Sequence, residues 1–394
     1  MYTVKFDTDA KLKVSADSMI LTTDSETNAG SKMLKGYKSL LESEALLKLK
    51  AAGYGLCGKT PVGEFAIDLL GETSVDGAYT KDGALMLASA DAVKTGDADI
   101  ALVLDVNGSV RRGTAQSGLV SVKPTYGTVS RYGTVPVACS GETVSLIGKT
   151  AEDCKNALSV ISGHDDKDGT SLSDELCKSA LSCGSVKRIA VLKSMTEGAD
   201  SCVKAKIDAF VNALKENGIE ACEIDDTVIV KSRAAWNILM SAELCNNVSR
   251  YDGVKYGYRT ENFTNLDELY TNSRTEAFGQ LLKTAILFGS DTLSTENYMK
   301  VYDKALRVRR VVLEAFNKIF GEFDAVLMPA CSKMVYTEKD TENKFLSYTE
   351  NLYTAPASIT GLPAVVACGV QLVGKAFSEG ALLDTVNAVC KEGK

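Results

Sequence analysis

Short apolar runs alternate along the chain with longer stretches in which apolar residues recur every three or four positions. The continuous runs at residues 100–105, 188–192 and 325–328 predict strands buried on both faces of a sheet. The run at 188–192 is followed by a helix whose apolar side chains share one face across residues 207–214, and then by a strand-like run at 219–224. Such a strand–helix–strand unit predicts a mixed or parallel β-sheet covered by helices.

The same spacing predicts further helices at residues 39–52, 236–251, 275–288 and 295–320. Gly53 follows the first of these as a C-terminal stop, and residues 54–57 are expected to form a short strand. The chain contains no internal repeat and only six prolines. We therefore expect one continuous α/β domain over residues 1–394.

Composition excludes several classes of protein. The 394 residues include 44 basic and 51 acidic side chains, which gives a net charge of −7, with 45% apolar and 24% charged residues. This balance is typical of a soluble globular protein, so we expect a cytoplasmic chain without a membrane span or a secretory signal. An acidic chain lacks the basic footprint of a protein that binds DNA or RNA unaided. The eleven scattered cysteines, with no Cys-x-x-Cys pair, predict reduced thiols rather than disulfides or a zinc site.

His164 is the only histidine in the sequence, which excludes metal sites built from several imidazoles. Its neighbours are rich in turn-forming residues, so we expect an exposed loop there. A catalytic base, if the protein uses one, is therefore not expected to be an imidazole. No metal ion or other cofactor is expected.

Residues 53–60 match the phosphate-loop pattern G-x-x-x-x-G-K-[ST]. The pattern binds phosphate only where a strand feeds the loop and a helix follows it. Here a helix is expected before Gly53, and a strand within the supposed loop. Nucleotide binding by Gly53 to Thr60 is therefore kept only as an alternative function.

A second candidate site follows the predicted strand at 100–105. Ser109 stands just beyond it, after an Asn-Gly pair, where a serine is well placed as a nucleophile beside backbone N–H donors. The competing interpretation is an ordinary Asn-Gly turn.

Motifs after Ser109 favour the nucleophile over the ordinary turn. Residues 118–127 read Gly-Leu-Val-Ser-Val-Lys-Pro-Thr-Tyr-Gly, and residues 129–133 read Val-Ser-Arg-Tyr-Gly. With these segments the chain closely resembles the amidase signature family, and within it the A subunits of glutamyl/aspartyl-tRNA amidotransferases. Further agreement lies at residues 58–60, 64–66, 72–74, 160–165, 249–253, 256–262 and 361–364. The resemblance implies an α/β fold with helices on both faces of a mixed central sheet.

The resemblance also implies a chemistry. In the family a serine attacks the side-chain amide of glutamine, a second serine relays its proton to a buried neutral lysine, and backbone N–H groups hold the oxyanion. The ammonia passes to a B subunit that amidates Glu-tRNA(Gln) or Asp-tRNA(Asn). The expected partners are therefore B and C subunits, with tRNA contacted only through the complex.

When this sequence is aligned with the family's catalytic motifs, only some of the catalytic residue types are found at the matching positions. The nucleophile falls on Ser109, and the oxyanion positions fall on Val106, Asn107 and Gly108. The relay serine falls on Leu85, whose side chain cannot carry a proton.

The lysine and the substrate anchors are also substituted. The best match to the lysine segment is residues 16–19, which contain no lysine, and Lys13 is a weak stand-in on a strand position expected to face solvent. The substrate-binding positions fall on Trp236, Ala285 and Asn351.

The sequence therefore predicts an amidase-signature protein with a retained fold and weak or absent glutaminase activity, acting as a structural subunit. One alternative is an active amidase in which Ser109 uses another base, such as Lys13 or Lys59. A decaying paralogue without a partner is a further alternative.

Overall fold

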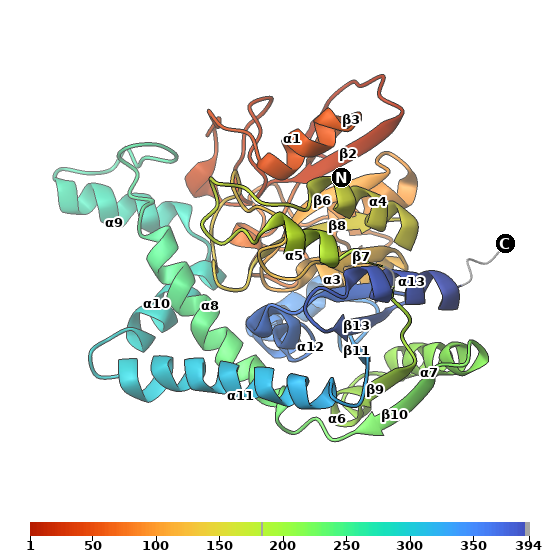
Figure 1. Ribbon diagram of the computed structural model, residues 1–394. Helices are drawn as coiled ribbons and strands as arrows, with labels where there is room; N and C mark the ends of the chain where they lie inside the picture. The colour runs from red at the N-terminus through yellow and green to blue at the C-terminus, as the bar shows by residue number, and fades with distance from the viewer. Residues whose placement is uncertain (183, 391–394) are drawn as a thin grey trace.

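The computed structural model describes residues 1–182 and 184–390. Their centre is an eleven-stranded mixed sheet in the order β1-β3-β2-β6-β8-β7-β12-β13-β11-β9-β10 (Figure 1). The strands are β1 Val4–Lys5, β2 Leu12–Asp17, β3 Tyr54–Thr60, β6 Ile100–Asp105, β7 Val120–Lys123, β8 Thr143–Gly148, β9 Arg188–Leu192, β10 Glu220–Ile224, β11 Ala325–Pro329, β12 Ala364–Ala367 and β13 Val370–Gly374. A separate hairpin pairs β4 (Thr80–Lys81) with β5 (Ala84–Leu85).

Helices cover both faces of this sheet, as the family resemblance implies. The helices are α1 Glu44–Ala51, α2 Ala88–Thr95, α3 Ser109–Ser117, α4 Ala151–Ile161, α5 Asp174–Ser179, α6 Lys193–Glu197, α7 Ser201–Glu216, α8 Ser232–Val248, α9 Leu266–Ala277, α10 Gln280–Thr292, α11 Asp303–Ile319, α12 Leu346–Thr360 and α13 Glu379–Val389. Helices α1, α4, α7 and α13 pack on one face, and α2 and α3 on the other. Helices α10, α11 and α12 pack around α8 (Figure 1).

The strand β6 explains why its sequence is a continuous apolar run. Ile100, Leu102 and Leu104 belong to the larger buried cluster, whereas Ala101 and Val103 belong to the smaller cluster on the opposite face. Successive side chains of a strand point to opposite faces, so a strand covered on both sides needs apolar residues at every position.

The predicted strands at 100–105, 188–192 and 325–328 are confirmed, although the last extends to Pro329. The single helix predicted at 275–288 is wrong, because α9 ends at Ala277 and α10 begins at Gln280. Between them, Gly279 adopts an extended conformation, and its N–H donates to the Glu64 carboxylate at 2.9 Å. The helix predicted at 39–52 begins only at Glu44.

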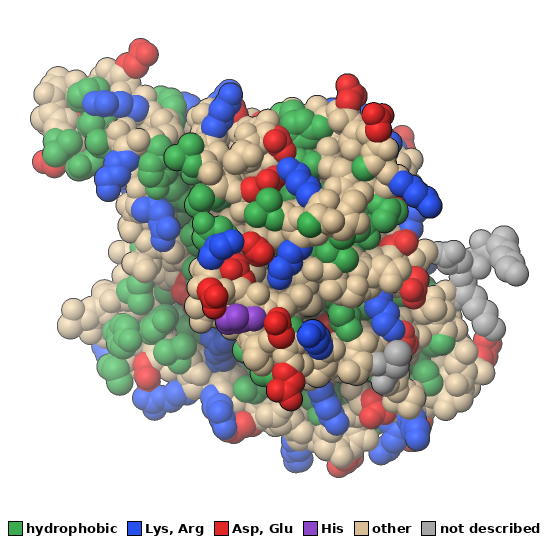
Figure 2. Space-filling view, turned by 45° about the horizontal axis from the view of Figure 1, so that its top comes forward, with side chains coloured by type: hydrophobic (Ala, Val, Ile, Leu, Met, Phe, Trp, Pro, Cys, Tyr) green, Lys and Arg blue, Asp and Glu red, His purple; other side chains and the backbone are tan. Residues whose placement is uncertain are grey.

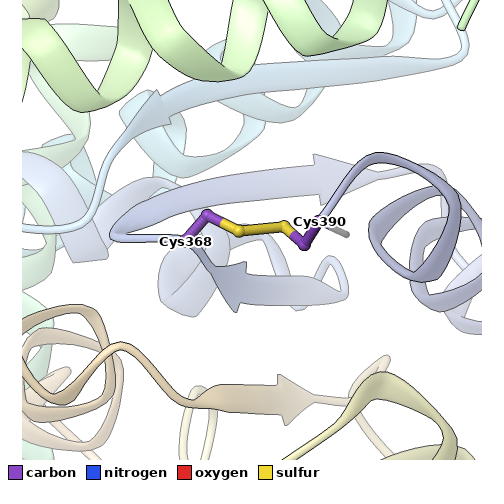
Figure 3. Close-up of a disulfide and its surroundings, with 2 residues drawn as sticks. All are labelled: Cys368 and Cys390. Carbon is purple, nitrogen blue, oxygen red and sulfur yellow. A yellow bond between two sulfur atoms is a disulfide. The ribbon is translucent and has the colours of Figure 1, made fainter. Parts of the chain in front are cut away.

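One pair of cysteines contradicts the prediction that all thiols are reduced. Cys368, in the turn between β12 and β13, forms a disulfide with Cys390, just after α13, with the two Cα atoms 6.6 Å apart (Figure 3). The turn and the end of the helix bring together two residues that are 22 positions apart in the sequence. The other cysteines among the described residues are free.

Surface charge, helix hydropathy and the exposure of His164 can each be compared with what the sequence predicts. Acidic and basic side chains are interspersed on the face shown in Figure 2. Within residues 1–182 and 184–390, no helix combines the length and the hydropathy needed to cross a bilayer. The His164 side chain is 45% exposed and lies 3.1 Å from Asp166, in the exposed loop that the sequence predicts.

Candidate active site

Ser109 lies at a strand-to-helix turn. The strand β6 ends at Asp105, three residues follow, and Ser109 is the first residue of α3. Gly108 makes the turn in the left-handed conformation, with φ +83°. A Cβ atom added there would lie 2.4 Å from the Thr354 side chain on α12, so both the backbone angle and the close approach require glycine.

Asn107 ties this turn to α8 and α12. Its side-chain nitrogen donates to the carbonyl oxygen of Ile67 at 2.7 Å, and its Oδ1 accepts from Trp236 Nε1 at 3.0 Å. The Asn351 amide nitrogen, oriented as its neighbours require, also donates to this Oδ1 at 3.1 Å. Thus two of the positions assigned to substrate binding, Trp236 and Asn351, contact a position assigned to the oxyanion hole.

A buried ion pair holds the base of the turn. The Arg111 guanidinium donates to Asp105 through Nε at 2.7 Å and to the carbonyl oxygen of Thr354 at 2.7 Å. It also donates to Ser358 Oγ at 2.7 Å, and both members of the pair are fully buried. Charged groups are tolerated in such a place only when their hydrogen bonds are satisfied.

Arg112 also belongs to the site, although no sequence motif predicts it. Its side chain is completely buried. Its guanidinium donates to the carbonyl oxygens of Asn107 at 3.0 Å, Asp68 at 3.1 Å and Leu69 at 3.2 Å. A fourth bond reaches Thr354 Oγ1 at 3.3 Å. Burial lowers the pKa of Arg112. The sequence signal is weak, because an Arg-Arg pair on a helix is usually exposed.

The residue predicted at the relay position is buried in the structure. Leu85, in β5, is buried, and its N–H donates to the carbonyl oxygen of Tyr336 at 2.8 Å. The Tyr336 hydroxyl donates to the buried Glu350 carboxylate at 2.6 Å, which also accepts the N–H of Ser332 at 2.9 Å. No pattern in the sequence points to this Tyr336–Glu350 pair, whose members are 14 positions apart.

The segment predicted to match the family's lysine segment holds a carboxylate. Asp17 ends β2, and its two oxygens accept the N–H groups of Leu104 and Met19, each at 2.9 Å. Burial raises the pKa of Asp17 to about 6. Lys13 lies at the other end of β2, where its N–H bonds to Asp99. That end is roughly 20 Å from the carboxyl end of β6, at about 3.3 Å per residue.

Lys59 is the other candidate base, and it is fully buried in β3. Its Nζ donates to the carbonyl oxygen of Ile20, and burial lowers the pKa of the ammonium group to about 8. The phosphate-loop pattern falls on this strand, which follows helix α1 and pairs with β1 and β2. The segment therefore does not have the strand–loop–helix form that phosphate binding requires.

Ser109 is 2% exposed, and its hydroxyl makes no hydrogen bond to any residue in the described part of the chain. Ala285, at the position of the substrate arginine, is buried in α10 within the apolar core. A pocket of about 200 Å³ is lined in part by Leu69, Gln280 and Phe345, and Ser109 is not among its lining residues.

A family model described as Amidase matches residues 88–383. The chain belongs to the amidase family. Its relatives within the family include the A subunit of the glutamyl-tRNA(Gln) amidotransferase of Acinetobacter baumannii (strain AB0057), which is 36% identical over 385 residues, or 92% of this chain and 78% of that protein. The protein of the same name from Lachnoclostridium phytofermentans (strain ATCC 700394 / DSM 18823 / ISDg) is 36% identical over 392 residues, covering 90% and 77% of the two chains.

Solved structures agree with this membership. The crystal structure of the A subunit of the glutamyl-tRNA(Gln) amidotransferase from Thermotoga maritima matches with a TM-score of 0.82 at 25% identity, over 100% of this chain and 87% of that one. A 6-aminohexanoate cyclic dimer hydrolase matches with a TM-score of 0.79 at 18% identity, over 96% and 84%, which shows the shared fold alone. The motif-based resemblance to the amidase family is thus confirmed.

Proposed function

We propose that this chain is an A-type subunit of a cytoplasmic tRNA-dependent amidotransferase, and that its own glutaminase activity is weak or absent. The similarity to amidotransferase A subunits over about nine-tenths of the chain supports the first part. The observation that carries the second part is that Ser109 is buried, and that no base among the described residues is bonded to its hydroxyl. In this proposal, B- and C-type subunits use free ammonia or ammonia from another amidase.

The proton path of the family has no counterpart around Ser109 in the described part of the chain. Leu85 stands at the relay position, and Asp17, near the lysine position, is bonded to two backbone N–H groups. Losing general base assistance typically lowers a rate by about 10²- to 10⁴-fold. A serine hydroxyl without such assistance is a weak nucleophile near neutral pH.

The substrate positions support the same conclusion. The charged anchors for a zwitterionic substrate are replaced by Ala285 and Asn351, and each charge-assisted hydrogen bond contributes roughly 1.5–3 kcal/mol to binding.

The direct test measures glutamine hydrolysis by the purified chain, alone and together with its B- and C-type subunits. We expect ammonia release no faster than from a Ser109→Ala variant, whereas the complex supplied with ammonium chloride amidates Glu-tRNA(Gln). Glutamine turnover that disappears in Ser109→Ala would contradict the loss of activity. Failure to amidate with ammonium chloride, or to form a complex, would contradict the subunit role.

One observation favours a second candidate, an amidase with a different base. Lys59 is buried with a pKa of about 8, as a lysine base requires. Its Nζ is bonded to Ile20 rather than to Ser109, which is why we rank this candidate second. A fluorophosphonate probe would label Ser109 if it were activated, and Lys59→Met would abolish the labelling.

A further inference from the structure

A groove that plays no part in the chemistry above runs beside α11, the long helix in the lower part of Figure 1. Its volume is about 680 Å³, and it is open along one side. One wall is α11, and the other consists of the segments after β7, α12 and β13. Leu313, Phe320 and Leu362 contribute apolar side chains to its lining.

The charge of this α11 groove is one-sided. Arg309 and Lys375 line it, and no aspartate or glutamate among the described residues does. Neither cation forms an ion pair with a residue of the described chain. Arg309 makes one hydrogen bond, to the carbonyl oxygen of Ser140 at 3.3 Å. In a chain of net charge −7, a groove with two uncompensated cations is a local exception, and it favours an anionic occupant.

The other two arginines of α11 are already paired. Arg307 pairs with Asp303, and Arg310 pairs with Glu314, each four positions along the same helix. Arg309 is therefore the one arginine of this helix without an ion pair among the described residues. The apolar floor and the cation on each wall of the groove match a polypeptide that alternates carboxylates with apolar side chains.

A second hollow lies beside the groove. Its volume is about 450 Å³, and it shares Tyr126 with the groove. Arg309, which lines the groove, donates to the carbonyl oxygen of Ser140, which lines the second hollow. Glu243 also lines the second hollow, so an acidic segment is expected in the α11 groove and not in this hollow.

We propose that the α11 groove binds an extended acidic segment of a partner subunit. Its carboxylates would face Arg309 and Lys375, and an apolar side chain between them would pack on Leu313 and Phe320. This inference rests on the proposed subunit role and deepens it by specifying where a partner binds and with what chemistry.

The test compares variants of the full chain in binding to its B- and C-type subunits, measured as a dissociation constant by interferometry. Arg309→Glu and Lys375→Glu place repulsive charges in the groove. Lys304→Glu and Arg310→Glu make the same change on exposed positions of α11 outside it. We expect each groove variant to weaken binding by a factor of about ten or more, with a loss that shrinks as salt rises, and each control to change it by less than a factor of about two.

Circular dichroism and thermal unfolding confirm that each variant is folded, and Lys375→Gln provides a milder change at an exposed position. Groove variants that bind like the unchanged chain would overturn the inference and leave the subunit role standing. Equal losses in groove and control variants would also overturn it. Failure of the unchanged chain to bind the subunits would overturn both proposals, and an effect on binding of a tRNA transcript alone would assign the groove to nucleic acid instead.

Discussion

Replacing the buried Arg112 by methionine tests whether this side chain holds the Ser109 turn in place. Methionine has a similar length but no donors, so four buried acceptors lose a partner at once. Each buried acceptor left unpaired costs roughly 1–3 kcal/mol. Removing the cation also removes its desolvation penalty, which offsets part of that cost. We therefore expect Arg112→Met to lower the free energy of unfolding by about 3–5 kcal/mol, the range for removing one buried charged partner.

The protein carries a built-in probe for this measurement. Trp236 is the only tryptophan, it is 1% exposed, and it bonds to the side chain of Asn107, whose carbonyl oxygen accepts from Arg112. Urea unfolding followed by tryptophan emission thus reports on the site itself. Arg112→Lys keeps the charge but lacks the planar fork, so we expect an intermediate loss. Arg310→Met, on an exposed arginine, is the control. An Arg112→Met variant within about 0.5 kcal/mol of the unchanged protein would refute the reasoning.

Three further changes can be followed by the same unfolding assay. Asp105→Asn breaks a buried ion pair and should cost about 3–5 kcal/mol, whereas a loss below about 1 kcal/mol would contradict the pairing. Gly108→Ala should cost more than Gly118→Ala, because both have positive φ but only Gly108 lacks space for a Cβ, and equal costs would contradict this. Burial lowers the pKa of Lys123 from 10.5 to about 7, so the unfolded chain binds more protons between these values and stability should rise with pH by up to about 1.4 kcal/mol per unit. Lys123→Met should remove that slope between about pH 7.5 and 9, and an unchanged slope would contradict it.

The sequence predicts the parts of the fold that depend on local pattern. A strand covered on both faces must be apolar throughout, and β6 and β9 have the predicted bounds for that reason. The break between α9 and α10 could not be predicted, because the N–H of Gly279 bonds to Glu64, which is 215 positions away. The disulfide could not be predicted for a related reason, because only the folded chain brings Cys368 and Cys390 together.

The same division applies to the site. The position of Ser109 at the start of a helix after a buried strand follows from local sequence and from family motifs. The surroundings of this turn could not be predicted from local sequence. Asn107 contacts Trp236 of α8, which is 129 positions away, and Arg112 contacts Thr354 of α12, which is 242 positions away. An adjacent pair of arginines on a helix normally predicts a solvated face. Here Arg111 and Arg112 are the two largest charged side chains to be completely buried among the described residues.

Under the proposed loss of glutaminase activity, these contacts explain how the fold persists. An amidase must keep a serine accessible, a pocket free of side chains and a lysine neutral in a dry environment, and such sites generally lower stability. In this chain the turn before Ser109 is held by Trp236 and Arg112, which both donate to Asn107. A chain retained for its shape alone gains from such bonds, because packing and satisfied hydrogen bonds add stability that an open site forgoes. This bonded turn is therefore what the proposed structural role predicts, and an Arg112 variant that gained glutaminase activity would show that these bonds alone suppress it.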